Sequence, residues 1–272
     1  MAAIDYEVEY NNRARVPENP AIIAGWARDA AAYRAAHPPL VLRYGDGARH
    51  TIDVFAGHDQ HAATVMFIHG GYWQALDASF FSHLAAGLNA HGISVALPNY
   101  DLCPAVSVSD IIDQMRAACR VLAKQGRRLV VSGHSAGGHL AACLLATDWH
   151  AIDPALPPGL IRAGYADSGL FDLRPLVPTS VNIALRMDEA TAHAISPLFW
   201  TPPVDSVFDA VVGGDESSEY FRQSRTLVEQ WGAAGVATRF GTVPGANHFT
   251  VIAPLADTNS AMVARLVEMA RL

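Results

Sequence analysis

The chain has 272 residues, of which 51% are hydrophobic, and its formal net charge is −7. This length and apolar content suffice for one large core, so the sequence predicts a single domain over residues 1–272. The negative charge disfavours nucleic acid and anionic membrane surfaces as partners, and no apolar run reaches the roughly 18 residues that a membrane span needs.

The N-terminal residues and the cysteines indicate a cytoplasmic protein. The first ten residues carry acids where a secretory signal would carry bases and an apolar stretch. The three cysteines, Cys103, Cys119 and Cys143, are odd in number and lack metal-type spacing, so we expect reduced, mostly buried thiols. No HExxH or CxxC pair occurs, and neither a metal nor another cofactor is expected.

In chain order, the pattern opens with a helix over residues 18–36 and a hairpin around the turn Gly45-Asp46-Gly47. Apolar runs that fit buried strands then alternate with runs that fit helices. The predicted strands are 40–44, 50–55, 64–69, 94–97, 129–131, 161–166, 210–213 and 237–243; the predicted helices after the first are 78–91, 111–125, 138–145, 219–232 and 252–272. This order predicts an α/β fold with a mostly parallel central sheet and helices on both faces.

Residues 168–200 interrupt the alternation after the sixth strand. They contain Pro175, Pro178 and Pro197, with a short helical stretch near 188–195. We expect a small insertion over the sheet edge, which could serve as a lid.

A G-x-S-x-G motif, Gly133-His134-Ser135-Ala136-Gly137, joins a predicted strand to a predicted helix. In that context a sharp turn exposes the serine hydroxyl as a nucleophile, and the glycines let strand and helix approach each other. The helix N-terminus behind the serine favours developing negative charge.

A serine nucleophile needs a base and an acid that orients the base. His248 follows the last predicted strand, where the chain order Ser, acid, His of an α/β-hydrolase fold places the base. His134 and His139 flank the serine and are expected to pack or hydrogen-bond locally. Asp215 and Glu216 both follow the penultimate strand, and spacing alone leaves the choice between them open.

Backbone amides for an oxyanion hole are expected from Gly70 and Gly71, which follow the strand 64–69, and from Ala136 beside the serine. His69 is interpreted as a structural hydrogen-bonding residue that holds this loop. Tyr72, Trp73 and Phe249 are candidate substrate-binding residues, together with two further aromatic residues near strand ends, Tyr100 and Phe171.

Several stretches resemble the kynurenine formamidases (arylformamidases), a branch of the esterase-type α/β hydrolases. The segment His69-Gly70-Gly71-Tyr72-Trp73 is similar to the HGGxW signature of that family, and its tryptophan is the most specific mark. Further similar stretches are 133–142, 168–175 with Thr179, Ser180 and Asn182, 216–224, and 247–249; residues 99–104 resemble a turn of related esterases.

The resemblance implies an α/β-hydrolase fold and a triad of Ser135, an acid and His248. The family's acid directly precedes a stretch like S-P-E-F-x-R-Q-S, and residues 217–224 here resemble it, with Ser218 in place of proline. That register favours Glu216 over Asp215. The implied reaction is hydrolysis of a small acyl amide such as N-formylkynurenine.

Two other functions remain open at this stage. The same residues could serve a carboxylesterase or thioesterase that acts on small acyl groups, or the fold could be a non-catalytic binding module. A small molecule is the expected partner, and a homodimer is left open. Arg186, in the insertion, is a candidate partner for a substrate carboxylate.

Overall fold

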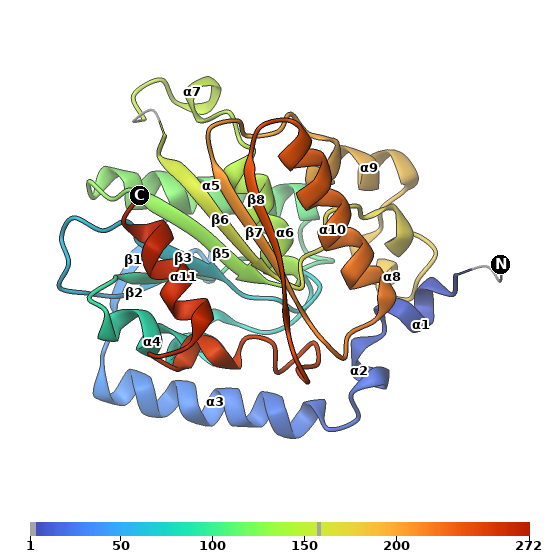
Figure 1. Cartoon of the computed structure of the whole chain (residues 1–272), viewed down its shortest axis with the longest axis horizontal. Coiled ribbons are helices and arrows are strands. Elements are labelled where there is room, and N and C mark those ends of the chain that lie inside the picture. The colour runs from blue at the N-terminus through green and yellow to red at the C-terminus, as the bar shows by residue number, and fades with distance from the viewer. Residues whose placement is uncertain (1–3, 157–158) are drawn as a thin grey trace.

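The computed structural model describes residues 4–156 and 159–272, so residues 1–3 and 157–158 of the predicted 1–272 domain lie outside it. Its centre is an eight-stranded sheet with the order β1-β2-β4-β3-β5-β6-β7-β8 (Figure 1). β1 pairs antiparallel with β2, and β2 with β4, whereas all other neighbours are parallel. The strands are β1 (Leu40–Arg43), β2 (Thr51–Phe55), β3 (Thr64–Ile68), β4 (Val95–Pro98), β5 (Leu129–His134), β6 (Ile161–Asp167), β7 (Val207–Gly213) and β8 (Ala237–Val243).

The predicted α/β fold, with its opening hairpin and mostly parallel sheet, is confirmed. The order of the parallel strands reverses between β3 and β5, because β4 lies on one side of β3 while β5 and later strands extend on the other. In open α/β sheets a ligand crevice forms at such a switch point, at the carboxyl ends of the strands. Gly70 and Gly71 follow β3, and Ser135 follows β5.

Successive residues of the central strands face opposite layers of helices, as the two-residue period of a strand requires. In β3, Met66 packs in one hydrophobic cluster, while Val65 and Phe67 pack in the other. The first cluster includes α5 (Val108–Lys124), α6 (Ala136–Leu145) and α10 (Ser218–Ala233); the second includes α3 (Asn19–Ala36), α4 (Ala85–Ala90) and α11 (Ala261–Ala270). The sheet is therefore covered on both faces.

Two predicted helices were too long or too regular. The stretch 78–91 splits into the 3₁₀ helix η1 (Ala78–Leu84) and α4. The closing helix was wrong over residues 252–260, where η4 (Ala253–Ala256) ends at an extended Asp257. α11 begins only after Ser260, whose side chain accepts a hydrogen bond from the Val263 amide and so caps the helix.

Residues 168–200 follow the sixth strand and contain four short helical turns. These are η2 (Arg174–Leu176), α8 (Asn182–Leu185), α9 (Glu189–Ala194) and η3 (Pro197–Phe199). Asp188 caps α9 by accepting a hydrogen bond from the Thr191 amide at 2.7 Å, which explains the helical stretch predicted near 188–195. The remaining short helix, α7 (Trp149–Ile152), follows α6.

Two N-terminal helices, α1 (Tyr6–Tyr10) and α2 (Asn12–Arg15), were not predicted. In Figure 1 they lie beside α8 and α10, far along the chain. The Glu9 carboxylate accepts hydrogen bonds from Ser218 Oγ at 2.8 Å and from the Glu219 amide at 3.0 Å, at the start of α10. A carboxylate there satisfies free amides of the helix N-terminus, so the segment is fastened to the fold.

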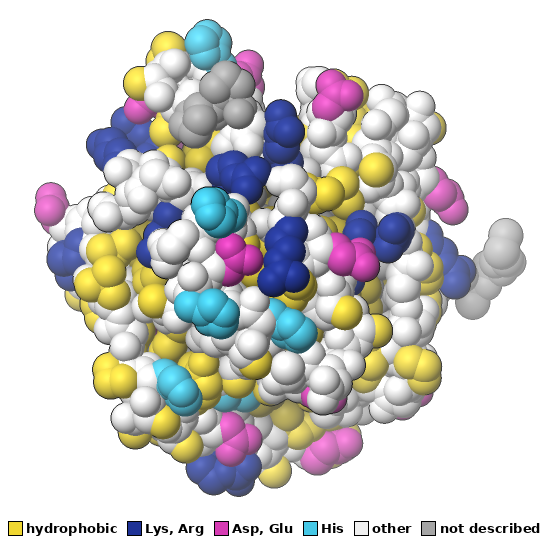
Figure 2. Space-filling view, turned by 60° about the vertical axis from the view of Figure 1, so that its left-hand side comes forward, with side chains coloured by type: hydrophobic (Ala, Val, Ile, Leu, Met, Phe, Trp, Pro, Cys, Tyr) yellow, Lys and Arg dark blue, Asp and Glu magenta, His cyan; other side chains and the backbone are white. Residues whose placement is uncertain are grey.

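Positively and negatively charged side chains are interspersed on the surface (Figure 2). Figure 2 shows a face on which basic, acidic and histidine side chains are interspersed with hydrophobic ones. Across the described part of the chain, no helix has both the length and the apolar character to cross a bilayer. Cys103, Cys119 and Cys143 are free and buried.

Candidate active site

Ser135 stands on a sharp turn between β5 and α6. Its backbone is left-handed, with φ 56° and ψ −117°, which is a strained conformation for a residue other than glycine. Strand and helix approach so closely that a Cβ on Gly133 of β5 would lie 2.3 Å from the carbonyl oxygen of Gly137 in α6. The Ser135 amide donates to the Asp167 carbonyl at 2.8 Å. The strand–turn–helix context that the motif requires is therefore present.

His248, in the loop after β8, pairs with Glu216. Its Nδ1 lies 2.6 Å from Glu216 Oε2, and the two side chains are 6% and 1% exposed. The other oxygen of Glu216 accepts hydrogen bonds from the Gly213 amide and from Ser168 Oγ. When Nδ1 donates to the carboxylate, Nε2 of the imidazole keeps a lone pair and can act as a base.

Asp215, the other acid candidate, does not reach the histidine. It is exposed, and its amide donates to the carbonyl of Ala246 at 2.9 Å. The Glu216 amide donates to the Gly213 carbonyl at 3.2 Å, which closes a turn. Because of this turn, Glu216 points back beneath the end of β7 while Asp215 points to solvent.

The serine and the histidine line one cavity. Within the described residues no hydrogen bond joins Ser135 Oγ to the His248 ring. The Tyr220 hydroxyl, also near His248, is bound by Asn12 Nδ2 at 2.7 Å and lies 2.8 Å from the Tyr72 hydroxyl; burial raises the pKa of this phenol. The rings of Tyr220 and His248 are 4.6 Å apart. Catalytic hydrogen bonds often tighten only when substrate binds.

His134 and His139 were expected to pack or hydrogen-bond locally, but each binds a backbone carbonyl far along the chain. Nε2 of His134 donates to the carbonyl of His248 at 2.7 Å, and Nε2 of His139 donates to the carbonyl of Ile195 at the same distance. Burial, followed by the nearby His248, holds the pKa of His134 well below its ordinary range. Neutral His134 can therefore brace the backbone of the His248 loop.

The loop after β3 brings unpaired amides next to the serine. A Cβ on Gly70 would lie 3.1 Å from the Cβ of Ser135, and Gly71 has a φ of 112° that favours glycine. His69 Nδ1 donates to the Gly70 carbonyl at 2.7 Å, and its ring stacks 4.2 Å from that of Tyr100. Among residues 4–156 and 159–272, the amides of Gly70, Gly71 and Ala136 have no protein acceptor. These amides are available to an oxyanion.

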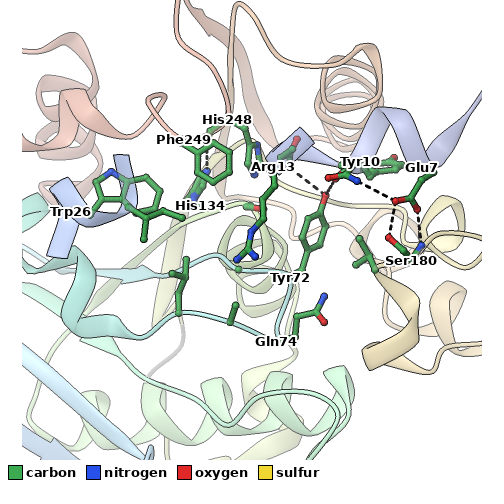
Figure 3. A pocket seen from close by; sticks show the side chains of 18 residues that line it. Glu7, Tyr10, Arg13, Trp26, Tyr72, Gln74, His134, Ser180, His248 and Phe249 are labelled. Carbon is green, nitrogen blue, oxygen red and sulfur yellow. Dashed lines mark hydrogen bonds between the residues drawn. The ribbon is translucent and has the colours of Figure 1, made fainter. Parts of the chain in front are cut away.

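The cavity has a volume of about 370 Å³ and is lined by 18 residues (Figure 3). Tyr72 and Phe249 are among them, as is Trp26 of α3. Trp73 is fully buried, with its ring 5.0 Å from that of His139, and does not line the cavity. It is a core residue in this structure.

Three other residues considered from the sequence also lie away from the cavity. Tyr100 and Phe171 are fully buried in the core. Arg186 is exposed at the end of α8, in a left-handed conformation. None of the three is among the lining residues.

The N-terminal helices supply lining residues that the sequence analysis missed, among them Glu7, Tyr10, Asn12 and Arg13. Asn12 is buried and donates to the Tyr220 hydroxyl at 2.7 Å. No motif marks this segment, since it is short and polar and its apolar residues show no clear period. The only available signal was the pair of capping residues that begin its two helices, Asp5 and Asn11.

Elsewhere in the part of the chain that the structure describes, no group of three or more histidine, cysteine, aspartate or glutamate side chains is placed to hold a metal ion. The arrangement is one of a serine on a sharp turn, an imidazole–carboxylate pair and free amides at or next to one cavity. Those groups provide what acyl transfer requires.

Residues 65–252 match a family model described as an alpha/beta hydrolase fold. A solved structure from Pyrobaculum calidifontis, a hyperthermophilic esterase, superimposes with a TM-score of 0.70 at 15% identity, covering 93% of this chain and 92% of the esterase, and so supports the fold. The protein is an α/β hydrolase and an enzyme.

Curated relatives define the branch. Kynurenine formamidase from Danio rerio is 30% identical over 236 residues, which are 83% of this chain and 80% of that protein. The Drosophila melanogaster kynurenine formamidase is also 30% identical, covering 80% and 77%. The chain belongs to the kynurenine formamidase branch of the α/β hydrolases.

A solved structure from Silicibacter sp. TM1040 is also similar. It is 36% identical with a TM-score of 0.84, and the match covers 96% of this chain and 98% of that one. That protein carries a provisional assignment as a thioesterase.

Proposed function

We propose that this enzyme hydrolyses the formamide of an N-formylated arylamine such as N-formylkynurenine, with Ser135 as nucleophile, His248 as base and Glu216 as orienting acid. The observation that carries the proposal is the buried 2.6 Å contact between His248 Nδ1 and Glu216 Oε2, since His248 and Ser135 line the same cavity. The substrate class follows from the relatives named kynurenine formamidase.

In the acylation half, Nε2 of His248 takes the proton of Ser135 as Oγ attacks the formyl carbon. The carbonyl oxygen becomes an oxyanion and accepts hydrogen bonds from the amides of Gly70, Gly71 and Ala136. As the tetrahedral intermediate collapses, the carbon–nitrogen bond breaks, and His248 gives its proton to the departing arylamine nitrogen. The formyl group is left as an ester on Ser135.

In the deacylation half, a water molecule attacks the formyl ester while His248 takes one of its protons. The carbon–Oγ bond breaks, His248 returns the proton to Ser135, and formate leaves. Glu216 stabilises the imidazolium that forms in each half and keeps the ring oriented.

The walls of the cavity suit an aromatic ring. Trp26, Phe249 and Tyr72 line it, and aromatic side chains offer apolar faces for ring stacking at modest entropic cost. A volume of about 370 Å³ falls within the range of small-molecule sites, roughly 300–1,000 Å³.

The similarity to the provisional thioesterase favours one alternative, hydrolysis of a small acyl thioester or ester. The purified enzyme should be assayed for formate release from N-formylkynurenine, and in parallel with p-nitrophenyl acetate and a short acyl thioester. The proposal expects the highest kcat/KM for the formamide. A dominant preference for either ester would support the alternative and overturn the formamidase assignment.

A further inference from the structure

Arg13 extends into the cavity from α2. Figure 3 shows its side chain reaching between Tyr72 on one side and His134 on the other. Of the described residues that line the cavity, Arg13 is the one lysine or arginine. Because Arg13 and Ser135 line the same cavity, a molecule bound there is exposed to the positive charge of Arg13.

The backbone that carries Arg13 is fixed on both sides. The preceding residue, Asn12, is buried and bound to Tyr220. The Arg13 carbonyl accepts a hydrogen bond from Asn19 Nδ2 at 3.1 Å, and Asn19 is itself buried. The backbone of Arg13 is therefore held in place, while its side chain is exposed at the cavity.

No carboxylate of the described residues neutralises the charge of Arg13. Within residues 4–156 and 159–272 the Arg13 guanidinium forms no ion pair and no hydrogen bond. The one carboxylate nearby on the cavity wall, Glu7, is occupied by the amide and the hydroxyl of Ser180, both at 2.7 Å. Those hydrogen bonds lower the pKa of Glu7, so it stays ionised and turned towards Ser180.

We propose that Arg13 binds a carboxylate on the substrate and so makes the enzyme selective for formylated arylamines that carry an acid group. This inference rests on the proposed function and names the substrate feature that the same cavity recognises. The planar guanidinium can form two parallel hydrogen bonds with a carboxylate, which fixes orientation as well as charge. Arg13 is a specificity residue; the chemistry stays with Ser135, His248 and Glu216.

The test uses two substrates with the same scissile bond. N-formylkynurenine carries the carboxylate, whereas 2-formamidoacetophenone keeps the formylated ring and the ketone but lacks the amino-acid portion. We expect the wild-type ratio of kcat/KM, acid substrate over neutral substrate, to fall about tenfold in Arg13→Gln, mainly through KM. The ratio in Arg13→Lys should lie between those of the wild type and Arg13→Gln, because lysine keeps the charge but lacks the paired donors of the guanidinium.

Arg15→Gln is the matched control, because Arg15 is an exposed arginine of the same helix that does not line the cavity. Its ratio should equal that of the wild type. An unchanged ratio in Arg13→Gln, or an equal loss in Arg15→Gln, would overturn the inference. Failure of the wild type to cleave either formamide would instead overturn the proposed function.

Discussion

The carboxyl ends of the sheet and the N-terminal helices α1 and α2 build the same cavity in different ways. At the strand ends, each proposed catalytic group sits in a motif whose backbone is constrained, as at Ser135 with its left-handed φ of 56°. The N-terminal helices place Glu7, Asn12 and Arg13 on the cavity with no motif at all. In the proposed mechanism, reaction chemistry is tied to local backbone geometry, whereas the proposed recognition depends on side chains that only tertiary docking brings in.

The largest expected effect tests the strand-end side of this comparison. Ser135→Ala should reduce kcat for N-formylkynurenine by about 10⁵-fold or more, because the nucleophile is lost while the other groups remain. Circular dichroism and the melting temperature should stay near those of the wild type. A folded variant with substantial turnover would show that the strand-end motif does not carry the reaction.

A second prediction separates two neighbouring acids. Glu216→Gln should lower kcat by roughly 10³- to 10⁴-fold, since the imidazole loses both its orienting carboxylate and the stabilisation of its charged form. Asp215→Asn is the matched control and should change kcat less than about threefold, because Asp215 is exposed and away from the ring. Steady-state assays measure kcat of both variants. A larger loss of kcat in Asp215→Asn than in Glu216→Gln would assign the acid role to Asp215.

The third prediction concerns the glycine loop. A Cβ on Gly71 would lie 2.3 Å from the Ala75 carbonyl oxygen, so Gly71→Ala must displace the loop. We expect kcat to fall about 10²-fold as the oxyanion donors move. Gly126→Ala is the control: Gly126 also has a positive φ, 73°, but a Cβ there meets nothing within 4 Å. A kcat as low in the control would show that backbone strain, and not the loop position, causes the loss.

These strand-end features are also the part of the site that could be predicted from sequence. Glycine, serine and histidine at fixed places relative to strands leave local signals, and the elbow geometry around Ser135 follows from them. The direction of single side chains could not be predicted. Tyr72 and Trp73 are neighbours with similar positive φ values, 50° and 56°, yet the first lines the cavity and the second is buried in the core.

The N-terminal helices could not be predicted because their stability comes from distant partners. Glu9 binds the start of α10, more than 200 residues away, and Tyr10 donates to Glu219 at 2.7 Å. Such contacts leave no periodic pattern in a stretch of ten residues. The fold as a whole was predictable since its strands and helices are marked by long apolar runs.

A fourth prediction tests whether the contact between Asn12 and Tyr220 holds the N-terminal segment against the cavity. Asn12→Ala removes the donor to the Tyr220 hydroxyl and should lower the free energy of unfolding by about 2 kcal/mol. It should also raise KM, because the segment that carries Arg13 loosens. Denaturant unfolding measures the free energy, and steady-state kinetics measure KM. Asn259→Ala is the control, because Asn259 is exposed. Wild-type stability and KM in Asn12→Ala would mean that the segment does not depend on this contact.

The smallest effect concerns pH and involves His69, in the loop after β3, and His139, in α6; residues 4–15 contain no histidine. Burial lowers the pKa of His69 and of His139 to about 4. The unfolded chain, with histidine pKa values of about 6.5, then binds more protons than the folded chain between pH 6.5 and 4. The free energy of unfolding should therefore fall as the pH falls through this window, by about 1 kcal/mol per histidine between pH 7 and 5.5.

His139→Gln should make that pH dependence shallower, because one of the depressed groups is gone and the glutamine amide can still donate to Ile195. Urea titrations at pH 7.0 and 5.5 provide the measurement. A slope equal to that of the wild type would show that His139 protonates as easily in the folded chain as in the unfolded one.

Fluorophosphonate labelling with peptide mapping, run beside a formate assay, asks whether Ser135 is the nucleophile for the formamide. We expect one adduct per chain, located on Ser135, with hydrolysis of N-formylkynurenine lost in proportion to the labelled fraction. Full labelling of Ser135 with undiminished formate release, or inactivation through a different residue, would contradict this assignment.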